Sequence, residues 1–166
     1  MKEYLAIDNG LNGGIVHLDT EGRIIGRMVM PTKFEEGRNR VDELALYEIA
    51  MELGMQVTVV LEKPVGSQSL NAATSMADSY ARTLTAFRVA GFEVLPIAPR
   101  TWQSALFKGV DGADTKIKAA RVFKAMFPEQ VEEFSTTKKG NKSKNIHDGL
   151  ADAALIALYA QRTNYE

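Results

Sequence analysis

The chain has 166 residues, a hydrophobic content of 45% and a formal net charge of −1, values that are ordinary for a globular protein. It contains no cysteine, which excludes disulfides, zinc-thiolate sites and cysteine nucleophiles. No apolar stretch reaches the roughly 20 residues of a membrane-spanning helix, and the first apolar run follows Met1 too closely for a signal peptide. We therefore expect a single domain over 1–166 in a soluble, cytoplasmic protein.

The charges are distributed unevenly along the chain. Between Arg100 and Lys144 there are ten basic and five acidic residues, a net charge of +5, so the remainder carries −6 to reach the total of −1. A basic region beside an acidic cluster is typical of a protein whose basic residues bind a nucleic-acid phosphate backbone and whose acidic residues hold metal ions. A solvated loop explains the lysines at 138, 139, 142 and 144 equally well.

Three short β-prone segments open the chain, at 4–8, 14–18 and 23–30. Turns that contain glycine separate them. This spacing predicts a three-stranded antiparallel meander.

Helices and strands then alternate. Apolar residues at four-residue steps over 41–53 predict an amphipathic helix that ends at Gly54. The continuous apolar run at 57–61 is typical of a buried, parallel strand. A long helix marked by apolar residues over 73–87 and a strand at 92–97 complete a βαβ unit.

The C-terminal third is expected to be mainly helical. Pro99 can occupy the first turn of a helix that runs through Trp102, and Asp114 can cap the next helix. The last helix, 147–162, is apolar almost all the way round, which predicts burial against the sheet. Residues 128–145 are polar, rich in lysine and without periodicity, so we expect a mobile loop there.

Four carboxylates lie where these elements begin or end. Asp8 ends the first strand, Glu62 ends the fourth, and Asp148 and Asp152 are about 40° apart on one face of the last helix. Converging carboxylates repel one another near pH 7 unless cations or protons relieve them. Magnesium accepts such hard oxygen donors. The pattern therefore predicts a magnesium-dependent nuclease with these four residues as metal ligands.

The hypothesised chemistry is hydrolysis of a phosphodiester. Two magnesium ions roughly 4 Å apart, bridged by Asp8, would activate a water and stabilise the leaving 3′ oxygen. Glu62 would bind one ion, and Asp148 and Asp152 the other. Manganese can substitute for magnesium, and the products would carry 5′-phosphate and 3′-hydroxyl ends.

Five short motifs, in order along the whole chain, carry a resemblance to a known family. They are Ala6-Ile7-Asp8-Asn9-Gly10 with Asn12-Gly13-Gly14, Val60-Leu61-Glu62-Lys63-Pro64, Pro99-Arg100-Thr101-Trp102, Asp114-Thr115-Lys116, and His147-Asp148-Gly149-Leu150-Ala151-Asp152-Ala153. Together they resemble the RuvC-type Holliday-junction resolvases of the RNase H-like superfamily. Bacterial members commonly space the last two ligands by three, which would place a ligand at Gly149. The spacing by four here is similar to the phage, poxvirus and organellar branch.

The order of the predicted elements is that of the RNase H-like fold, an α/β fold. Its mixed five-stranded sheet has three antiparallel strands, then two parallel ones, and is flanked by helices. The resemblance implies a homodimer that binds a four-way DNA junction and nicks two strands symmetrically. Branched DNA is therefore the expected partner.

Further site residues follow from the resemblance. Lys116 resembles a family lysine near the scissile phosphate, where its charge would stabilise the transition state; the alternative is an exposed helix lysine. Ser67 and Gln68 lie in a loop that approaches the junction centre in the family, or they only connect a strand to a helix. His147 is a minor possibility as a metal ligand, since it lies about 140° from Asp152 around the helix.

Other residues have a weaker connection to function. Arg100 and Lys118, together with Lys138 and Lys139, are candidate contacts to DNA phosphates. Trp102 has the spacing of a core residue. The alanine-rich face of the helix over 71–90, with Ala73, Ala77 and Ala81, can pack closely against a second copy of the chain or within its own domain.

Rival functions share parts of this pattern. Another RNase H-like nuclease, acting on RNA or on other branched DNA, would have the same ligands and a different substrate. A non-catalytic junction-binding module would not need four acids. A sugar-kinase or actin-like ATPase, suggested by the turn after Asp8, needs two such domains, and one chain of this length supplies one.

Overall fold

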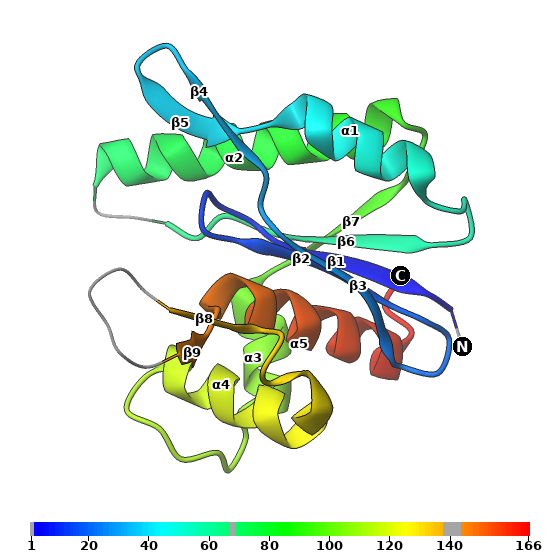
Figure 1. Ribbon diagram of the computed structural model, residues 1–166, viewed down its shortest axis with the longest axis vertical. Coiled ribbons are helices and arrows are strands. Elements are labelled where there is room, and N and C mark those ends of the chain that lie inside the picture. The colour runs from blue at the N-terminus through cyan, green and yellow to red at the C-terminus, as the bar shows by residue number, and fades with distance from the viewer. Residues whose placement is uncertain (1, 67–68, 138–143) are drawn as a thin grey trace.

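A central β-sheet with helices on both faces forms the framework of the computed structural model, which describes residues 2–66, 69–137 and 144–166 (Figure 1). In spatial order, its five strands are β3 (Ile24–Val29), β2 (Gly14–Leu18), β1 (Tyr4–Asp8), β6 (Thr58–Glu62) and β7 (Val94–Ile97). The first three are antiparallel, whereas β6 and β7 run parallel to β1. The predicted mixed sheet, with β1 at its centre, is therefore confirmed.

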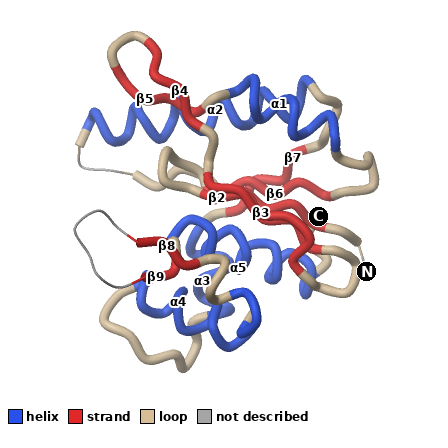
Figure 2. The backbone as a smooth tube through the Cα atoms, viewed as in Figure 1, coloured by secondary structure: helices blue, strands red, loops and turns tan. Residues whose placement is uncertain are grey.

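Two layers of helices enclose this sheet (Figures 1 and 2). The helices α1 (Glu43–Glu52) and α2 (Leu70–Val89) cover one face, and α3 (Pro99–Leu106), α4 (Thr115–Met126) and α5 (Asp148–Thr163) lie on the other. Each face has its own cluster of buried apolar side chains. None of the described helices is both long and apolar enough to cross a membrane.

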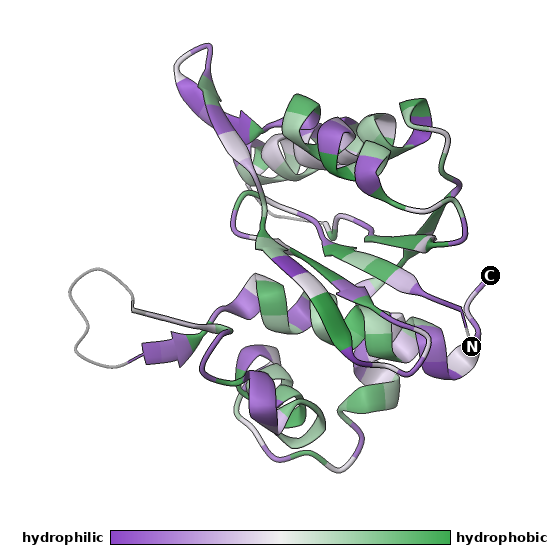
Figure 3. Ribbon diagram, turned by 45° about the vertical axis from the view of Figure 1, so that its right-hand side comes forward, coloured by the Kyte–Doolittle hydropathy of each residue, from purple (hydrophilic) through white to green (hydrophobic). Residues whose placement is uncertain are grey.

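The last helix has a larger buried share than any other described helix. It lies against β1 and β2, and eleven of its sixteen residues are buried. Apolar residues gather in the sheet and on the helix faces that adjoin it (Figure 3). The prediction that the apolar C-terminal helix packs against the sheet is confirmed.

A hairpin between β3 and α1 was not predicted. It consists of β4 (Thr32–Glu35) and β5 (Arg38–Val41), joined by a turn in which Glu36 and Gly37 have positive φ angles of 50° and 79°. Val41, expected in the first turn of the helix, is the last residue of β5. The helix begins after it because the side chain of Asp42 accepts hydrogen bonds from the backbone N–H groups of Leu44 and Ala45.

Ion pairs hold this hairpin against α1 and α2. Arg82 on α2 contacts Glu35 of the hairpin at 3.0 Å and Glu43 of α1 at 2.6 Å. Arg40 of β5 lies 3.8 Å from Asp78 on α2. Burial alone would raise the pKa of Glu43, but hydrogen bonds from Lys33 and Arg82 outweigh it and lower this pKa to about 2. Ion pairs thus hold the outer part of the hairpin, where Phe34 is exposed, while Val41 at the end of β5 is buried in the apolar core.

The segment 128–145 is more ordered than the predicted loop. It contains a 3₁₀ turn, η1 (Pro128–Gln130), and an antiparallel ladder of β8 (Ser135–Thr137) with β9 (Lys144–Ile146). Phe134 is fully buried, with its ring centroid 4.6 Å from that of Phe123. A single aromatic side chain thus anchors a polar segment, and the loop prediction is wrong for the described part. Residues 138–143 lie outside it.

Glycine allows the start of α5 to touch the turn between β1 and β2 directly. Gly13 and Gly149 form a backbone bridge. A Cβ atom at Gly149 would lie 2.4 Å from the carbonyl oxygen of Asn12, and one at Gly14 would lie 2.7 Å from the carbonyl oxygen of Gly149. No side chain fits in this contact, which places the first turns of α5 beside the end of β1.

Substitution Gly149→Ala therefore tests the contact. The added methyl group forces α5 away from the turn, at a cost of about 1–3 kcal/mol or more. For a chain of this size, the melting temperature should fall by roughly 5–10 °C. Gly66→Ala is the matched control, since a Cβ there meets nothing within 4 Å. Equal melting temperatures for the two variants, measured by differential scanning calorimetry, would show that the contact is not required.

Candidate metal centre

Four carboxylates from three elements meet at one edge of the sheet. Asp8 and Glu62 end the parallel neighbours β1 and β6, so both side chains leave the sheet at the same edge. The first two turns of α5 bring Asp148 and Asp152 to this edge, one helical turn apart. The charges of Glu62, Asp152 and Asp148 all act on Asp8. The structure thus brings together the four acids that the sequence singled out.

Burial and mutual repulsion make these carboxyls hard to ionise together. Burial, followed by the charges of Glu62 and Asp152, raises the pKa of Asp8 well above its usual range. Burial likewise raises the pKa of Glu62, although hydrogen bonds from Trp102 and Asp8 oppose the shift. The pKa of Asp152 is raised to about 7 by burial and then by the charges of Glu62 and Asp148. A cation in their midst would relieve this repulsion.

Protein groups already bind several of these carboxyl oxygens. The indole Nε1 of Trp102 donates to Glu62 Oε1 at 2.8 Å, and Lys116 Nζ donates to Asp148 Oδ2 at 3.0 Å. Asp8, in its protonated form, hydrogen bonds to Glu62. As they stand, no three His, Asp or Glu side chains in the described parts of the chain are arranged to hold one ion. Metal binding therefore requires Asp8 to give up its proton and Asp148 to exchange Lys116 for the ion.

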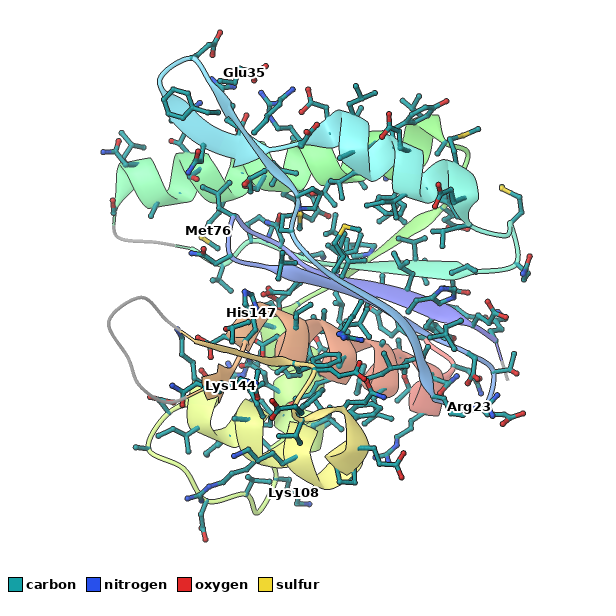
Figure 4. The ribbon with its side chains drawn as sticks, viewed as in Figure 1. Arg23, Glu35, Met76, Lys108, Lys144 and His147 are labelled. Atoms are coloured by element: carbon teal, nitrogen blue, oxygen red, sulfur yellow. The ribbon has the colours of Figure 1, made fainter. Side chains whose placement is uncertain are left out.

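Three of the carboxylates, Asp8, Asp148 and Asp152, line a groove of about 870 Å³, whereas Glu62 does not line it. Met76 of α2 and His147, the residue before α5, line it from the two helical layers (Figure 4). Asn9 lines it too: its Nδ2 donates to the carbonyl of Met76 at 3.1 Å, while its Oδ1 is buried and has no hydrogen-bond partner among the described residues. Carboxylate and amide oxygens are the donors that magnesium and manganese accept, so the residues of the groove fit such an ion.

His147 has a structural role in this groove. Its Nδ1 accepts a hydrogen bond of 3.2 Å from the backbone N–H of Leu150 and so caps α5. The cap directs the N-terminus of α5 to the groove. The positive end of the helix dipole then lies beside Asp148.

The predicted contacts to DNA fall into three groups. Lys116 lines the carboxylate groove. Arg100, which is exposed, and Lys118, which is half-buried, do not line it. The remaining four lie outside the described residues: Ser67, Gln68, Lys138 and Lys139.

A second groove, of about 480 Å³, adjoins the first at Lys116 and Asp148. It runs between α4 and the β8-β9 ladder, and the additional lysines that line it are Lys124 and Lys144. Lys144 is paired with Glu132. Neither lysine was predicted as a site residue, although Lys116, Ala120 and Lys124 follow at four-residue steps along one face of α4. That spacing is the signal that the sequence offered.

No protein-family model matches the sequence, and no curated protein matches it significantly either. Solved structures do match. The RuvC protein of Thermus thermophilus in complex with a Holliday junction substrate has a TM-score of 0.65 and 18% identity, and the match covers 99% of this chain and 96% of that one. A second structure of the Thermus thermophilus protein has a TM-score of 0.63 and 19% identity, with coverages of 98% and 96%. Likeness at this identity establishes the fold, which is RNase H-like, as predicted.

The raised pKa of Asp152 predicts how stability depends on pH. In the folded protein it is about 7, against about 4 when unfolded, so the stabilisation is complete below pH 4 and is lost as the pH rises to 7. Without divalent cations, Asp152→Asn should therefore stabilise the chain at pH 8 by about 2–4 kcal/mol.

Calorimetry in a chelating buffer measures this difference. The melting temperature of Asp152→Asn should exceed that of the unmodified chain by roughly 5 °C or more at pH 8 and by less at pH 5. The control is Asp111→Asn, an exposed aspartate away from both grooves. A chain equally stable at both pH values, with no gain from Asp152→Asn, would contradict the repulsion.

Proposed function

We propose that this chain is a Holliday-junction resolvase, an endodeoxyribonuclease that nicks four-way DNA junctions symmetrically by magnesium-dependent hydrolysis of phosphodiester bonds. One observation carries the hydrolytic part: four carboxylates meet at one end of β1 and β6, where Asp8, Asp148 and Asp152 line an open groove and Glu62 lies beside Asp8. Three of the four, Asp8, Glu62 and Asp152, have raised pKa values. The likeness in fold to RuvC, solved with a Holliday junction substrate, supports the choice of DNA junctions.

The four carboxylates and Lys116 would have different roles in this reaction. Asp8, Glu62, Asp148 and Asp152 would hold two divalent cations, with Asp8 in the central position. The chemistry that bound magnesium supplies at such a site is activation of a water and neutralisation of the leaving 3′ oxygen. Lys116 is paired with Asp148 in this structure. Its ammonium group would move to the scissile phosphate and stabilise the negative charge of the transition state. The products would have 5′-phosphate and 3′-hydroxyl ends.

The lysine-lined groove along α4 offers a path for the DNA backbone. Lys116 and Lys144 are 70% and 57% exposed, and with Lys124 they lead away from the carboxylates between α4 and β9. Such point charges bind phosphates without reading sequence, and they make the affinity dependent on salt. The other proposed contacts to DNA are Ser67, Gln68, Arg100, Lys118, Lys138 and Lys139.

Symmetric nicking of a junction requires two active sites, which we propose a homodimer supplies. Ala77 and Ala81 of α2 are exposed, so burial within the chain's own domain does not explain this alanine-rich face. Leu70 and Val89, at the two ends of α2, are 81% and 70% exposed. Small side chains with apolar ones at each end allow a second copy of α2 to approach closely.

Cleavage assays test the substrate. Labelled four-way junction, duplex, single-stranded DNA and RNA:DNA hybrid are offered with magnesium and with manganese. Paired, symmetric nicks should form in the junction. Asp8→Asn and Asp152→Asn, which remove metal ligands, should each slow cleavage by about 100-fold or more while the junction still binds. Asp19→Asn, on the β2-β3 turn, is the control and should cut normally.

Other outcomes separate the rival functions. Preferred cleavage of the hybrid would replace the junction resolvase with an RNA-directed nuclease of the same fold. Binding of junctions without cleavage under either metal would favour a non-catalytic binding module.

Light scattering tests the dimer. Ala81→Glu places a charge on the exposed face of α2 and should convert a dimer into a monomer, with nicks on the two strands no longer paired. Ala105→Glu makes the same change on the exposed side of α3 and should remain dimeric. A monomeric unmodified chain, or a dimer that survives Ala81→Glu, would exclude this face as the interface.

A further inference from the structure

Trp102, the only tryptophan in the chain, is fully buried beside the candidate metal centre. It lies in α3, which follows directly after β7, the neighbour of β6. Its ring packs edge-on against Phe107, with centroids 5.4 Å apart. The indole therefore has a fixed place in the apolar core, with its polar edge toward the end of β6.

The hydrogen bond of this indole goes to a candidate metal ligand. A buried indole N–H requires a partner. Here the partner is Oε1 of Glu62, at 2.8 Å and forty residues away in sequence. The bond uses one carboxylate oxygen and fixes the rotation of the carboxylate. The second oxygen is left for Asp8.

The opposite side of the centre is held much more loosely. Asp148 is bound by Lys116, and these side chains are 40% and 70% exposed. An exposed ion pair of this kind exchanges readily with solvent and contributes little energy. The centre therefore combines one preset ligand, Glu62, with one ligand, Asp148, that is free to move when a cation or a phosphate enters.

We propose that Trp102 is a positioning residue that presets Glu62 for a divalent cation. The proposal rests on the function proposed above, because it takes Glu62 to be a metal ligand. Hydrogen bonds that orient a metal ligand commonly change metal affinity or activity by about 10–100-fold when they are removed. Because the chain has one tryptophan, its fluorescence reports on the surroundings of a single indole, whose hydrogen-bond partner is Glu62.

Fluorescence of the full chain provides a readout that does not depend on activity. Addition of magnesium should produce a saturable change in tryptophan emission, since the carboxylate beside the indole then shares its charge with the ion. Glu62→Gln keeps an acceptor for the indole and weakens metal binding, so the change should disappear. Asp19→Asn should retain it. Unchanged emission in the unmodified chain, at magnesium concentrations that calorimetry shows to be saturating, would overturn the proposal.

Two core variants separate positioning from simple packing. Trp102→Phe removes the N–H donor, and by calorimetry it should weaken magnesium binding about 10-fold or more. The kcat for junctions should fall while KM stays near its original value. Phe107→Leu loosens the packing around the indole and lowers the melting temperature, but it should leave magnesium affinity unchanged. Equal losses of affinity in the two variants, or none in Trp102→Phe, would overturn the positioning role.

Failure of this inference differs from failure of the proposed function. Magnesium-dependent junction cleavage with unchanged emission removes only the role of Trp102. A saturable emission change that Glu62→Gln abolishes, without cleavage of any DNA, supports the role of Trp102 and removes the nuclease. If Trp102→Phe fails to fold, the fluorescence of the unmodified chain and of Glu62→Gln still decides the question.

Discussion

Contact between two backbones, with no side chain between them, determines where the last helix can lie. Gly149 at the start of α5 meets Gly13 and Gly14 in the turn after β1, and a Cβ atom would not fit at Gly14 or at Gly149. Because α5 is also buried against the sheet, its position along the sheet and the direction of its axis are both fixed. The carboxylates at positions 148 and 152 are consequently held beside Asp8. Packing of α5 in the apolar core thus determines the positions of the carboxylates in the candidate metal centre.

Holding these carboxylates close together destabilises the folded chain when no metal is bound, because they repel one another. Burial and neighbouring charges raise the pKa of Asp8, Glu62 and Asp152, so the ionised cluster opposes folding near neutral pH. Hydrogen bonds from Trp102 and Lys116 offset part of this cost. Sites that combine such strain with an open groove are commonly functional. The same repulsion provides the driving force for binding cations.

The sequence predicted what depends on local pattern. Strand ends placed Asp8 and Glu62 together, and helical periodicity placed Asp148 and Asp152 on one face. It did not predict contacts that depend on folding distant segments together. The β4-β5 hairpin is one example, because its ion pairs join residues about 40 positions apart, such as Arg40 and Asp78.

Two aromatic residues show the same limit at the site itself. Trp102 was expected in the core and is buried there, but its bond to Glu62 depends on how β6 and α3 lie side by side. Phe134 orders a segment whose composition is that of a loop, since one buried ring outweighs many polar neighbours. Candidate binding residues in such segments, Lys144 among them, are located only by the folded structure.

The central claim is that the four carboxylates jointly hold divalent cations in the groove. Anomalous scattering from crystals soaked in manganese tests it most directly. Anomalous density is expected between Asp8 and Asp152, within about 2.5 Å of their carboxyl oxygens. The bond between Lys116 and Asp148 should open when the ion is bound. Crystals that remain without density in the groove at high manganese concentration, with that bond intact, would contradict the claim.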